Sequence, residues 1–304
     1  MGNTFAAAPL VGREASPDDM WPCNEMEQYM TSKTAPRWLA TAVLAMAMAA
    51  AAPAHAELST EELAKLAQNP IANLISVPFQ SNTNFNVGPL KGTQEVLNIQ
   101  PVIPFELNSE WNVITRTIVP IIWNPALSPT IDSTSGVGDI VFSALLSPGK
   151  PGEFIWGAGP IFQLPTNSSA ELGNKNWGMG LEGVVLRIEK GSPWVYGAIV
   201  NNIWSLTSNK QGGSYSNFLL QPFVNYNIPD GDGLYLQTAP EFTASWKADS
   251  GQQWTVPLGG GIGKVVHFGR LPVNMHLTAY YNVVKPDYGA NWQVQFQMQF
   301  MFPK

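Results

Sequence analysis

The sequence predicts an all-β protein: a transmembrane, antiparallel, up-and-down β-barrel of about twelve strands, with a short N-terminal helix. The segment 291–302 alternates glutamine with apolar residues at a period of two, which is typical of a strand between two different solvents. Only 12% of the residues are charged, yet no apolar run after residue 56 is long enough for a membrane-spanning helix. The final strand by itself leaves a soluble β-sandwich open as the alternative.

The N-terminal region has the pattern of a secretory signal peptide. Lys33 and Arg37 precede an apolar, alanine-rich run at 38–52, which is too short to span a membrane. Small residues follow and end at Ala56, as at a signal-peptide cleavage site. We therefore expect residues 30–56 to be a signal peptide that is cleaved near Ala56, and the mature chain to be located in the bacterial outer membrane.

The rest of the chain divides into three parts. Residues 1–29 are polar and acidic, which is atypical for the start of a signal peptide, so Met30 is an alternative start and 1–29 an over-extended reading frame. We expect 57–72 to be a short periplasmic helix with a linker, and 73–304 to be the barrel. The only cysteine, Cys23, precedes the apolar run, so the predicted mature chain has no disulfide and no thiolate ligand.

One helix is predicted, over residues 59–68. Ser59 and Glu62 have the spacing of a capping box, and Asn69-Pro70 ends the helical pattern. The sequence leaves three roles open for this helix: a plug of the barrel, a periplasmic handle, or a solvated leader.

From residue 73 onward the chain is predicted to consist of strands, which average more than ten residues where strands of soluble proteins average five or six. They are 73–86, 94–107, 111–123, 138–147, 154–165, 176–189, 194–206, 217–228, 234–247, 252–268, 272–284 and 291–302. Tilted strands need about 9–11 residues to cross a bilayer. In 176–189 and 194–206 the alternation is ambiguous, and we expect bulges there.

The predicted connections alternate in length. Turns after the even-numbered strands average about four residues, whereas loops after the odd-numbered strands average between eight and nine. Short periplasmic turns and longer outer loops are typical of outer-membrane barrels. This pattern places both termini on the periplasmic side.

Tryptophans are predicted to form two aromatic girdles. Nine follow residue 56, and each lies at or within about two residues of a predicted strand end. They are Trp111, Trp123, Trp156, Trp177, Trp194, Trp204, Trp246, Trp254 and Trp292. A sandwich core would place some of them at strand centres, whereas the two interfaces of a bilayer attract aromatic rings to the strand ends.

Prolines inside the predicted strands argue against a regular barrel, because each removes a donor from the sheet ladder. They include Pro101, Pro104, Pro120, Pro160, Pro222, Pro240 and Pro257. Bulges or local widening of the wall would accommodate them, although the sequence gives no full account of so many.

Several segments together resemble a family of bacterial outer-membrane barrels named for the meta-pathway of phenol degradation, whose members are also labelled "transporter" or "neuromedin U". The segments are 73–80, 96–101, 114–120, 219–227, 254–261 and 279–286, so the resemblance extends over the predicted mature chain. It implies a barrel in which the prolines belong to the architecture. It implies no catalytic or ligand-binding residue.

Six side chains are candidates to line the lumen. By the alternation of their strands we expect Glu106, Arg116, Glu241, Lys247, His276 and Tyr280 to point inward. Charges inside a membrane barrel face water or one another. The four charged residues are therefore expected either to set solute selectivity or to form an ion-paired plug in a narrow lumen.

No pattern in the sequence indicates catalysis, a metal or another cofactor. His267 and His276 are the only histidines after residue 56, and they come without cysteine or a carboxylate cluster. Asp230–Gly233 resembles a fragment of a calcium loop but lacks the remaining ligands, so we expect a tight turn. The net charge of −6 gives no basic surface for nucleic acid.

The leading hypothesis for function is a porin-like channel or transporter that lets small solutes, including aromatic or hydrophobic ones, pass through the lumen. The alternatives are a non-conducting envelope barrel that binds, senses or scaffolds, and an outer-membrane lipid-modifying enzyme. Such enzymes use histidine on the lipid-facing surface, whereas His276 has the parity of the lumen, so we expect no enzyme.

The expected partners are the bilayer, a small solute and the outer-membrane insertion machinery. The aromatic pair Phe300 and Phe302 resembles the C-terminal signal that this machinery reads, although Pro303-Lys304 follow it here.

Overall fold

The structure is a computed structural model. It describes residues 58–128, 130–150, 152, 154–208 and 213–303. The predicted signal peptide, its cleavage near Ala56 and the alternative start at Met30 all lie outside the described residues.

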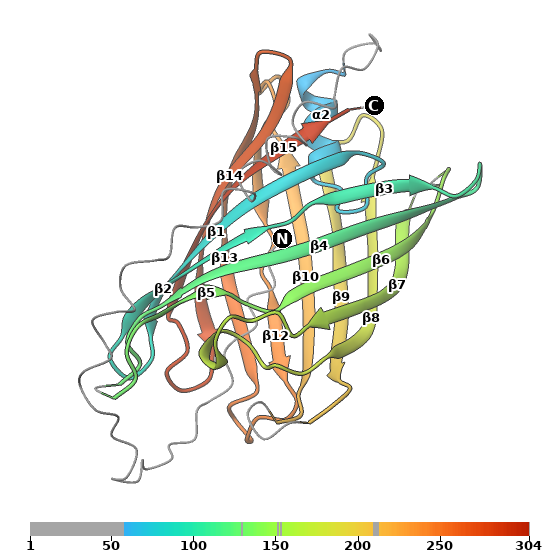
Figure 1. Ribbon diagram of the computed structural model, residues 1–304. Coiled ribbons are helices and arrows are strands. Elements are labelled where there is room, and N and C mark those ends of the chain that lie inside the picture. Colours follow the sequence, from blue (N-terminus) through green and yellow to red (C-terminus); the bar gives the residue numbers. More distant parts are fainter. Residues whose placement is uncertain (1–57, 129, 151, 153, 209–212, 304) are drawn as a thin grey trace, which may run out of the picture. The chain divides into compact units, whose positions relative to one another are not determined.

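The described residues form a closed antiparallel β-barrel of twelve strands, as predicted (Figure 1). The wall consists of fifteen strand segments in one sheet. They are β1 (Ile75–Val87), β2 (Gly92–Ile99), β3 (Val102–Glu106), β4 (Trp111–Asn124), β5 (Thr134–Val137), β6 (Ile140–Pro148), β7 (Phe154–Leu164), β8 (Gly178–Ile188), β9 (Trp194–Ser205), β10 (Ser216–Asn227), β11 (Leu234–Thr238), β12 (Phe242–Ser245), β13 (Trp254–Phe268), β14 (Leu271–Val284) and β15 (Trp292–Phe302). Three strands are each interrupted once, as β2–β3, β5–β6 and β11–β12, so the fifteen segments make twelve strands.

The first and last strands close the barrel. Strand β1 pairs with β15 without interruption from Ile75 opposite Phe302 to Phe85 opposite Trp292. The glutamines of β15 point inward and are buried, while its aromatic residues point outward: Phe300 lies edge-on against Phe79, with ring centroids 5.8 Å apart. The alternation of 291–302 and its pairing with 73–86 are therefore confirmed.

The two ends of the barrel differ in their connections. At the end that holds the helix and the C-terminus, the turns are short, down to the pair 269–270 between β13 and β14 (Figure 1). At the other end the loop 165–177 is the longest and contains the 3-10 helix η1 (Ala170–Leu172). The loop after β1 is the exception on that side: it is a tight turn at 88–91, where Gly88 and Lys91 have positive φ angles.

Two of the prolines lie in the interruptions of the strands and a third lies beside one. Pro101 falls between β2 and β3, and Pro240 falls between β11 and β12. Pro120, in β4, lies opposite the gap between β5 and β6, where its carbonyl accepts a hydrogen bond of 2.9 Å from the Gly138 N–H. Proline has no backbone N–H to donate. These prolines lie where the neighbouring strand offers no backbone partner, so no hydrogen bond of the sheet is lost.

The other four prolines follow the same rule. Pro257 lies at the register shift between β13 and β14, and Pro104 lies beyond the single pair that joins β3 to β1. Pro160 lies where the pairing of β6 with β7 is interrupted, and Pro222 where β10 changes partner from β12 to β11. The seven prolines are thus accommodated by local breaks in one ladder rather than by a different fold.

The bulges expected in 176–189 and 194–206 are absent, so this prediction is wrong. Strands β8 and β9 pair in one unbroken register, from Gly178 opposite Ser205 to Ile188 opposite Val195. Their alternation is hard to read because most inward positions here carry glycine or aliphatic residues, so both faces of these strands are largely apolar.

The predicted helix is present as α2 (Thr60–Ala67). Its capping box is complete: the Glu62 N–H donates to the Ser59 Oγ (3.2 Å), and the Ser59 N–H and Oγ both donate to the Glu62 carboxylate (3.0 Å each). These two bonds from Ser59 lower the pKa of the Glu62 carboxyl group. Within the described residues, no helix has the length and apolar character that crossing a membrane requires.

The seam between β1 and β15 gives a test of the closure. Deletion of residues 302–304 removes the outermost pair of the seam and the aromatic end of β15, so we expect the barrel not to assemble. Heat-modifiable gel mobility of the membrane fraction measures assembly. Deletion of 303–304 alone is the matched control and leaves the seam intact; normal mobility of the longer deletion would contradict the role given to Phe302.

Candidate functional site

The interior of the barrel is the candidate site, and its surface has two chemically different sides. On β1, β2, β14 and β15 the inward positions are mainly amides, and Gln80, Asn82 and Asn98 have no exposed surface. On β4, β6, β8, β9 and β10 many inward positions are aliphatic or aromatic, among them the buried Ile199 and Phe223. The alternation of the final strand alone would suggest a uniformly polar lumen. The structure shows instead that the lumen is amphipathic, with one amide side and one largely apolar side.

Hydrogen bonds connect the amide side into a chain. The Asn82 Nδ2 donates to the backbone carbonyl of Val96 (3.4 Å), so the Asn82 Oδ1 is the atom that accepts from its neighbours. It accepts from Gln80 Nε2 (3.1 Å) and Gln295 Nε2 (3.0 Å), and Gln100 Nε2 in turn donates to the Gln80 Oε1 (2.6 Å). A backbone group thus fixes which way several buried amides point.

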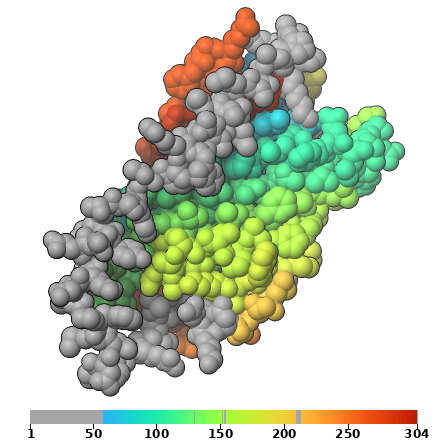
Figure 2. All heavy atoms as spheres, viewed as in Figure 1, coloured from blue at the N-terminus to red at the C-terminus, as the bar shows by residue number. Residues whose placement is uncertain are grey.

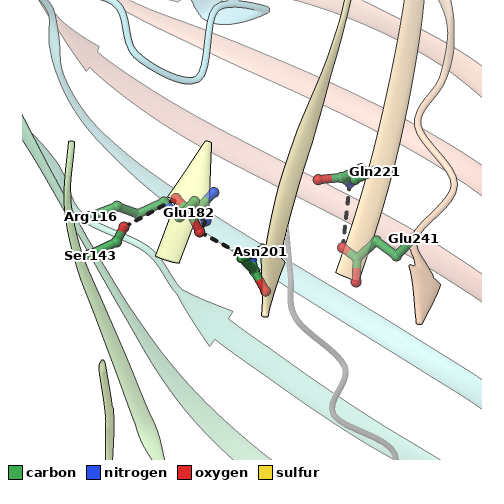
Figure 3. Close-up of polar contacts among 6 residues, drawn as sticks. All are labelled: Arg116, Ser143, Glu182, Asn201, Gln221 and Glu241. Atoms are coloured by element: carbon green, nitrogen blue, oxygen red, sulfur yellow. Dashed lines mark hydrogen bonds and ion pairs between the residues drawn. The ribbon is translucent and has the colours of Figure 1, made fainter. Parts of the chain in front are cut away.

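A buried ion pair crosses the aliphatic side. Arg116 of β4 donates through Nη2 to both carboxylate oxygens of Glu182 of β8, at 3.0 and 3.1 Å (Figure 3). Ser143 (3.3 Å) and Asn201 (3.1 Å) donate to the same carboxylate. The Glu182 side chain has no exposed surface and that of Arg116 is 9% exposed. Because β6 and β7 lie between β4 and β8 in the sheet, the pair links strands that are not neighbours.

Four of the six predicted lumen residues have side chains that lie in the interior of the barrel. Arg116 is one, and Glu182, its partner, was missed because the alternation of its strand is unreadable. Glu241 lies between β11 and β12, where Gln221 donates to it at 3.5 Å (Figure 3). Tyr280 is buried, and its hydroxyl oxygen accepts from the Ala239 N–H (3.1 Å).

His276 is the fourth, and Glu106 and Lys247 are corrections to the prediction. His276 is 8% exposed and its Nε2 lies 3.3 Å from the Gln295 Oε1. Glu106 ends β3 with an exposed side chain that accepts from Asn73 (3.2 Å), and Lys247 is exposed in the turn after β12. Alternation predicts whether a side chain points inward or outward. It does not predict whether the residue lies within the barrel or beyond its end.

The helix α2 packs against inward-facing side chains at its end of the barrel. Its buried residues Leu63, Ala64 and Ala67 belong to one apolar cluster with Leu74, Tyr235, Val265 and Met301. Helix residues also form polar contacts: the Gln68 and Asn227 side chains exchange two hydrogen bonds (2.9 and 3.2 Å), and Lys65 Nζ donates to the Ser192 carbonyl (2.8 Å). The helix is therefore docked on the barrel wall and is not a leader surrounded by solvent.

The crowding around the helix explains one of the glycines of β13. The ring of Tyr235 lies over Gly263, so a Cβ at position 263 would clash with the ring. The Tyr235 hydroxyl passes across β13 and donates to Asn274 Oδ1 on β14 (2.8 Å). Gly263 is therefore part of the packing under the helix.

Two cavities flank the residues that follow α2. One is lined by Arg116, Gln100, Val102 and Leu74, among others, and its empty space of about 470 Å³ includes open solvent. The other has His276 in its lining, and its empty space of about 440 Å³ likewise includes open solvent. Ala67 and Gln297 line both, so the end of the helix separates two parts of one interior space.

The outer surface is apolar and carries aromatic rings at both ends. Leu181 is 66% exposed and Leu277 is 52% exposed, both on outward positions. Trp111, Trp156 and Trp194 lie at the α2 end, and the other six tryptophans lie at the opposite end. In the outer face drawn in Figure 2, the segments coloured green to yellow lie side by side and their side chains form a closed surface.

Within the described residues, no group of three or more His, Cys, Asp or Glu side chains is arranged to hold a metal ion. Asp230–Gly233 forms a turn in which Asp230, Asp232 and Gly233 have positive φ angles, and the Leu234 N–H donates to the Gly231 carbonyl (3.1 Å). The residues expected to form a tight turn thus do so.

Comparisons with known proteins give likenesses only at the level of structure. No protein-family model matches the chain, and no curated protein matches it by sequence. The solved structure of the COG4313 outer membrane channel from Pseudomonas putida F1 matches with a TM-score of 0.56 and 17% identity, covering 75% of this chain and 94% of that one. This likeness shows a shared barrel fold.

Two weaker likenesses are also to outer-membrane proteins. The Salmonella typhi outer membrane phospholipase matches with a TM-score of 0.38 and 11% identity, over 81% of this chain and 98% of that one. A bacterial polysaccharide outer membrane secretin matches with a TM-score of 0.38 and 12% identity, over 76% and 99%. At these scores neither likeness carries an argument about this chain.

The ion pair gives a test of the interior. Glu182→Leu leaves the Arg116 guanidinium buried without its counter-charge, so we expect a loss of about 3–5 kcal/mol in the free energy of unfolding. Urea titration of the folded band on unheated gels measures it. The double change Arg116→Met with Glu182→Leu removes both charges and is expected to recover most of the loss.

Glu189→Gln is the matched control, because the Arg187–Glu189 pair (3.8 Å) is largely exposed on the glutamate side and surface pairs contribute about 0–1 kcal/mol. An equal effect of the Glu182 and Glu189 substitutions would contradict the buried network.

Proposed function

We propose that the chain is an outer-membrane channel for small solutes and that residues 60–72 close it at the periplasmic end. The observation that carries the proposal is the combination of an apolar outer surface with an amide-lined interior. Hydrogen-bonding groups inside and aliphatic groups outside are the arrangement of a barrel between lipid and a wet lumen.

The outer surface supports a location in the membrane. Large apolar side chains at outward positions, such as Leu181 and Leu277, would favour aggregation in water but face lipid in a bilayer. The tryptophans at the two ends then lie at the two interfaces. Cleavage near Ala56 and recognition of Phe300 and Phe302 by the insertion machinery belong to the same proposal.

The interior supports passage once the helix moves. The contact of α2 with the wall includes three buried apolar side chains, the reciprocal amide hydrogen bonds of Gln68 and the bond from Lys65. A contact made by one helix of eight residues favours local release over global unfolding. Because Ala67 lines both cavities, withdrawal of the helix joins them into a single space along the barrel.

The resemblance to the barrels named for the meta-pathway of phenol degradation, and the shared fold with an outer membrane channel, agree with this proposal. The amphipathic interior suits small solutes with an apolar part, aromatic ones among them, because aliphatic side chains line one side and amides the other. We propose no catalytic role for any residue.

A non-conducting barrel that binds, senses or scaffolds is the second candidate. The observation that favours it is the filling of the interior by α2 together with the buried Arg116–Glu182 pair. The two candidates differ in one respect: a channel opens when the helix is removed, whereas a scaffold remains closed.

Deletion of residues 58–72 is expected to raise the conductance of the purified barrel in planar bilayers at least several-fold over the full mature chain, because the helix no longer occupies the end of the lumen. The deleted barrel should also let small neutral solutes swell liposomes faster. Glu61→Gln, on the exposed side of α2, is the control and should conduct like the unaltered chain.

If the deletion impairs assembly, the double change Gln68→Ala with Asn227→Ala loosens the same contact with all residues of the helix still present. A folded barrel that lacks the helix and passes neither ions nor small solutes would contradict the channel and favour the scaffold.

A further inference from the structure

We propose that the cavity beside His276 is a binding site for a small neutral solute that carries a hydroxyl group. This inference rests on the proposed channel function and names the class of solute that the channel takes. The cavity lies between the end of α2 and the inner faces of β10, β11, β14 and β15, with an empty volume of about 440 Å³ that includes space open to the rest of the interior.

The lining of this cavity selects against ions. Among the described residues that line it, none is charged; most of its polar groups are amides, including Gln221 and Gln237. An ion that leaves water for such a lining loses hydration without gaining a counter-charge. The carboxylate of Glu241, which accepts from Gln221, disfavours an anion further. Amides both donate and accept, so they suit neutral hydroxylated molecules.

The chain of amides fixes the protonation of His276. Asn82 Nδ2 donates to the Val96 carbonyl, so Asn82 Oδ1 accepts from Gln295 Nε2, which turns the Gln295 Oε1 toward the histidine. A carbonyl oxygen only accepts, so the His276 Nε2 at 3.3 Å carries the proton. In the neutral form of the ring this contact selects the tautomer whose Nδ1 is a hydrogen-bond acceptor.

This acceptor has no partner within the described residues. The His276 side chain is more than nine-tenths buried, and its Nδ1 makes no hydrogen bond. A buried acceptor without a donor is unfavourable, and a hydroxyl group of a bound solute supplies that donor. Phe223 and Tyr235 also line the cavity, so its wall contains aromatic carbon beside the amides.

Two sources share this chemistry: polyols and aromatic alcohols. The test is titration calorimetry of the full mature chain in detergent micelles, with glucose and benzyl alcohol as the neutral probes and glucuronate and benzoate as their anionic counterparts. A detergent blank is subtracted from each titration. We expect at least one neutral probe to bind, and its anionic counterpart to bind at least ten-fold more weakly.

His276→Leu removes the acceptor and is expected to raise the Kd of the neutral probe about ten-fold, the effect of one hydrogen bond. His276→Gln keeps an acceptor and should lose less. His267→Leu is the matched control. His267 is exposed near the end of β13, so its substitution should leave the Kd of the neutral probe unchanged. Gln237→Leu tests the same lining if the His276 variants do not assemble, with assembly followed by heat-modifiable mobility.

Three results would overturn the inference: neither neutral probe binds, the anions bind as tightly, or folded His276→Leu and Gln237→Leu barrels bind like the unaltered chain. The assay needs no ion current, so it is independent of the channel test. A barrel that conducts but binds neither neutral probe overturns this inference alone, whereas one that binds but never conducts overturns the channel and retains the site.

Discussion

The structure depends on one constraint: the backbone N–H and C=O groups of the strands are satisfied within a single closed sheet. In the proposed membrane location this closure is essential, because a backbone in hydrocarbon finds no other partners and only a closed sheet provides them with strands. The pairing of β1 with β15 along eleven positions provides that closure. It also explains why seven prolines are tolerated. Each lies where the ladder is already interrupted, at a gap between segments, a register shift or a change of partner, so no regular ladder bond loses its donor.

Closure creates an interior, and the filling of that interior determines what the barrel does. Amides on one side are held in fixed orientations by a chain that starts at a backbone carbonyl, while aliphatic side chains and one ion pair occupy the other side. The helix α2 meets both sides through a small contact. In the proposed channel this packing keeps the lumen closed, and α2 is the element that moves when the channel opens.

Much of the fold could be predicted from the sequence, because alternation reports the difference between lipid and lumen. It succeeded in β15, where glutamine faces inward at every second position, and it failed in β8, where Glu182 stands among inward glycines and aliphatic residues. Glu182 could therefore not be predicted from the sequence as the partner of Arg116. Glu106 and Lys247 were misplaced because alternation says nothing about where a strand passes the rim. The helix was predicted from its capping box, but its docking site depends on Tyr235, Val265 and Met301, which come together only when the barrel closes.

The central claim is that α2 closes a conducting barrel, and a reversible crosslink tests it most directly. Cysteines placed at positions 68 and 227, where the side chains now exchange two hydrogen bonds, are joined by a short bis-methanethiosulfonate, which forms a reducible disulfide with each cysteine and releases methanesulfinate. The current through single barrels is then recorded in a planar bilayer. If α2 closes the channel, the barrel stays closed while the crosslink is intact and shows opening events after reduction. Equal currents before and after reduction, with the crosslink confirmed by mass, would contradict it.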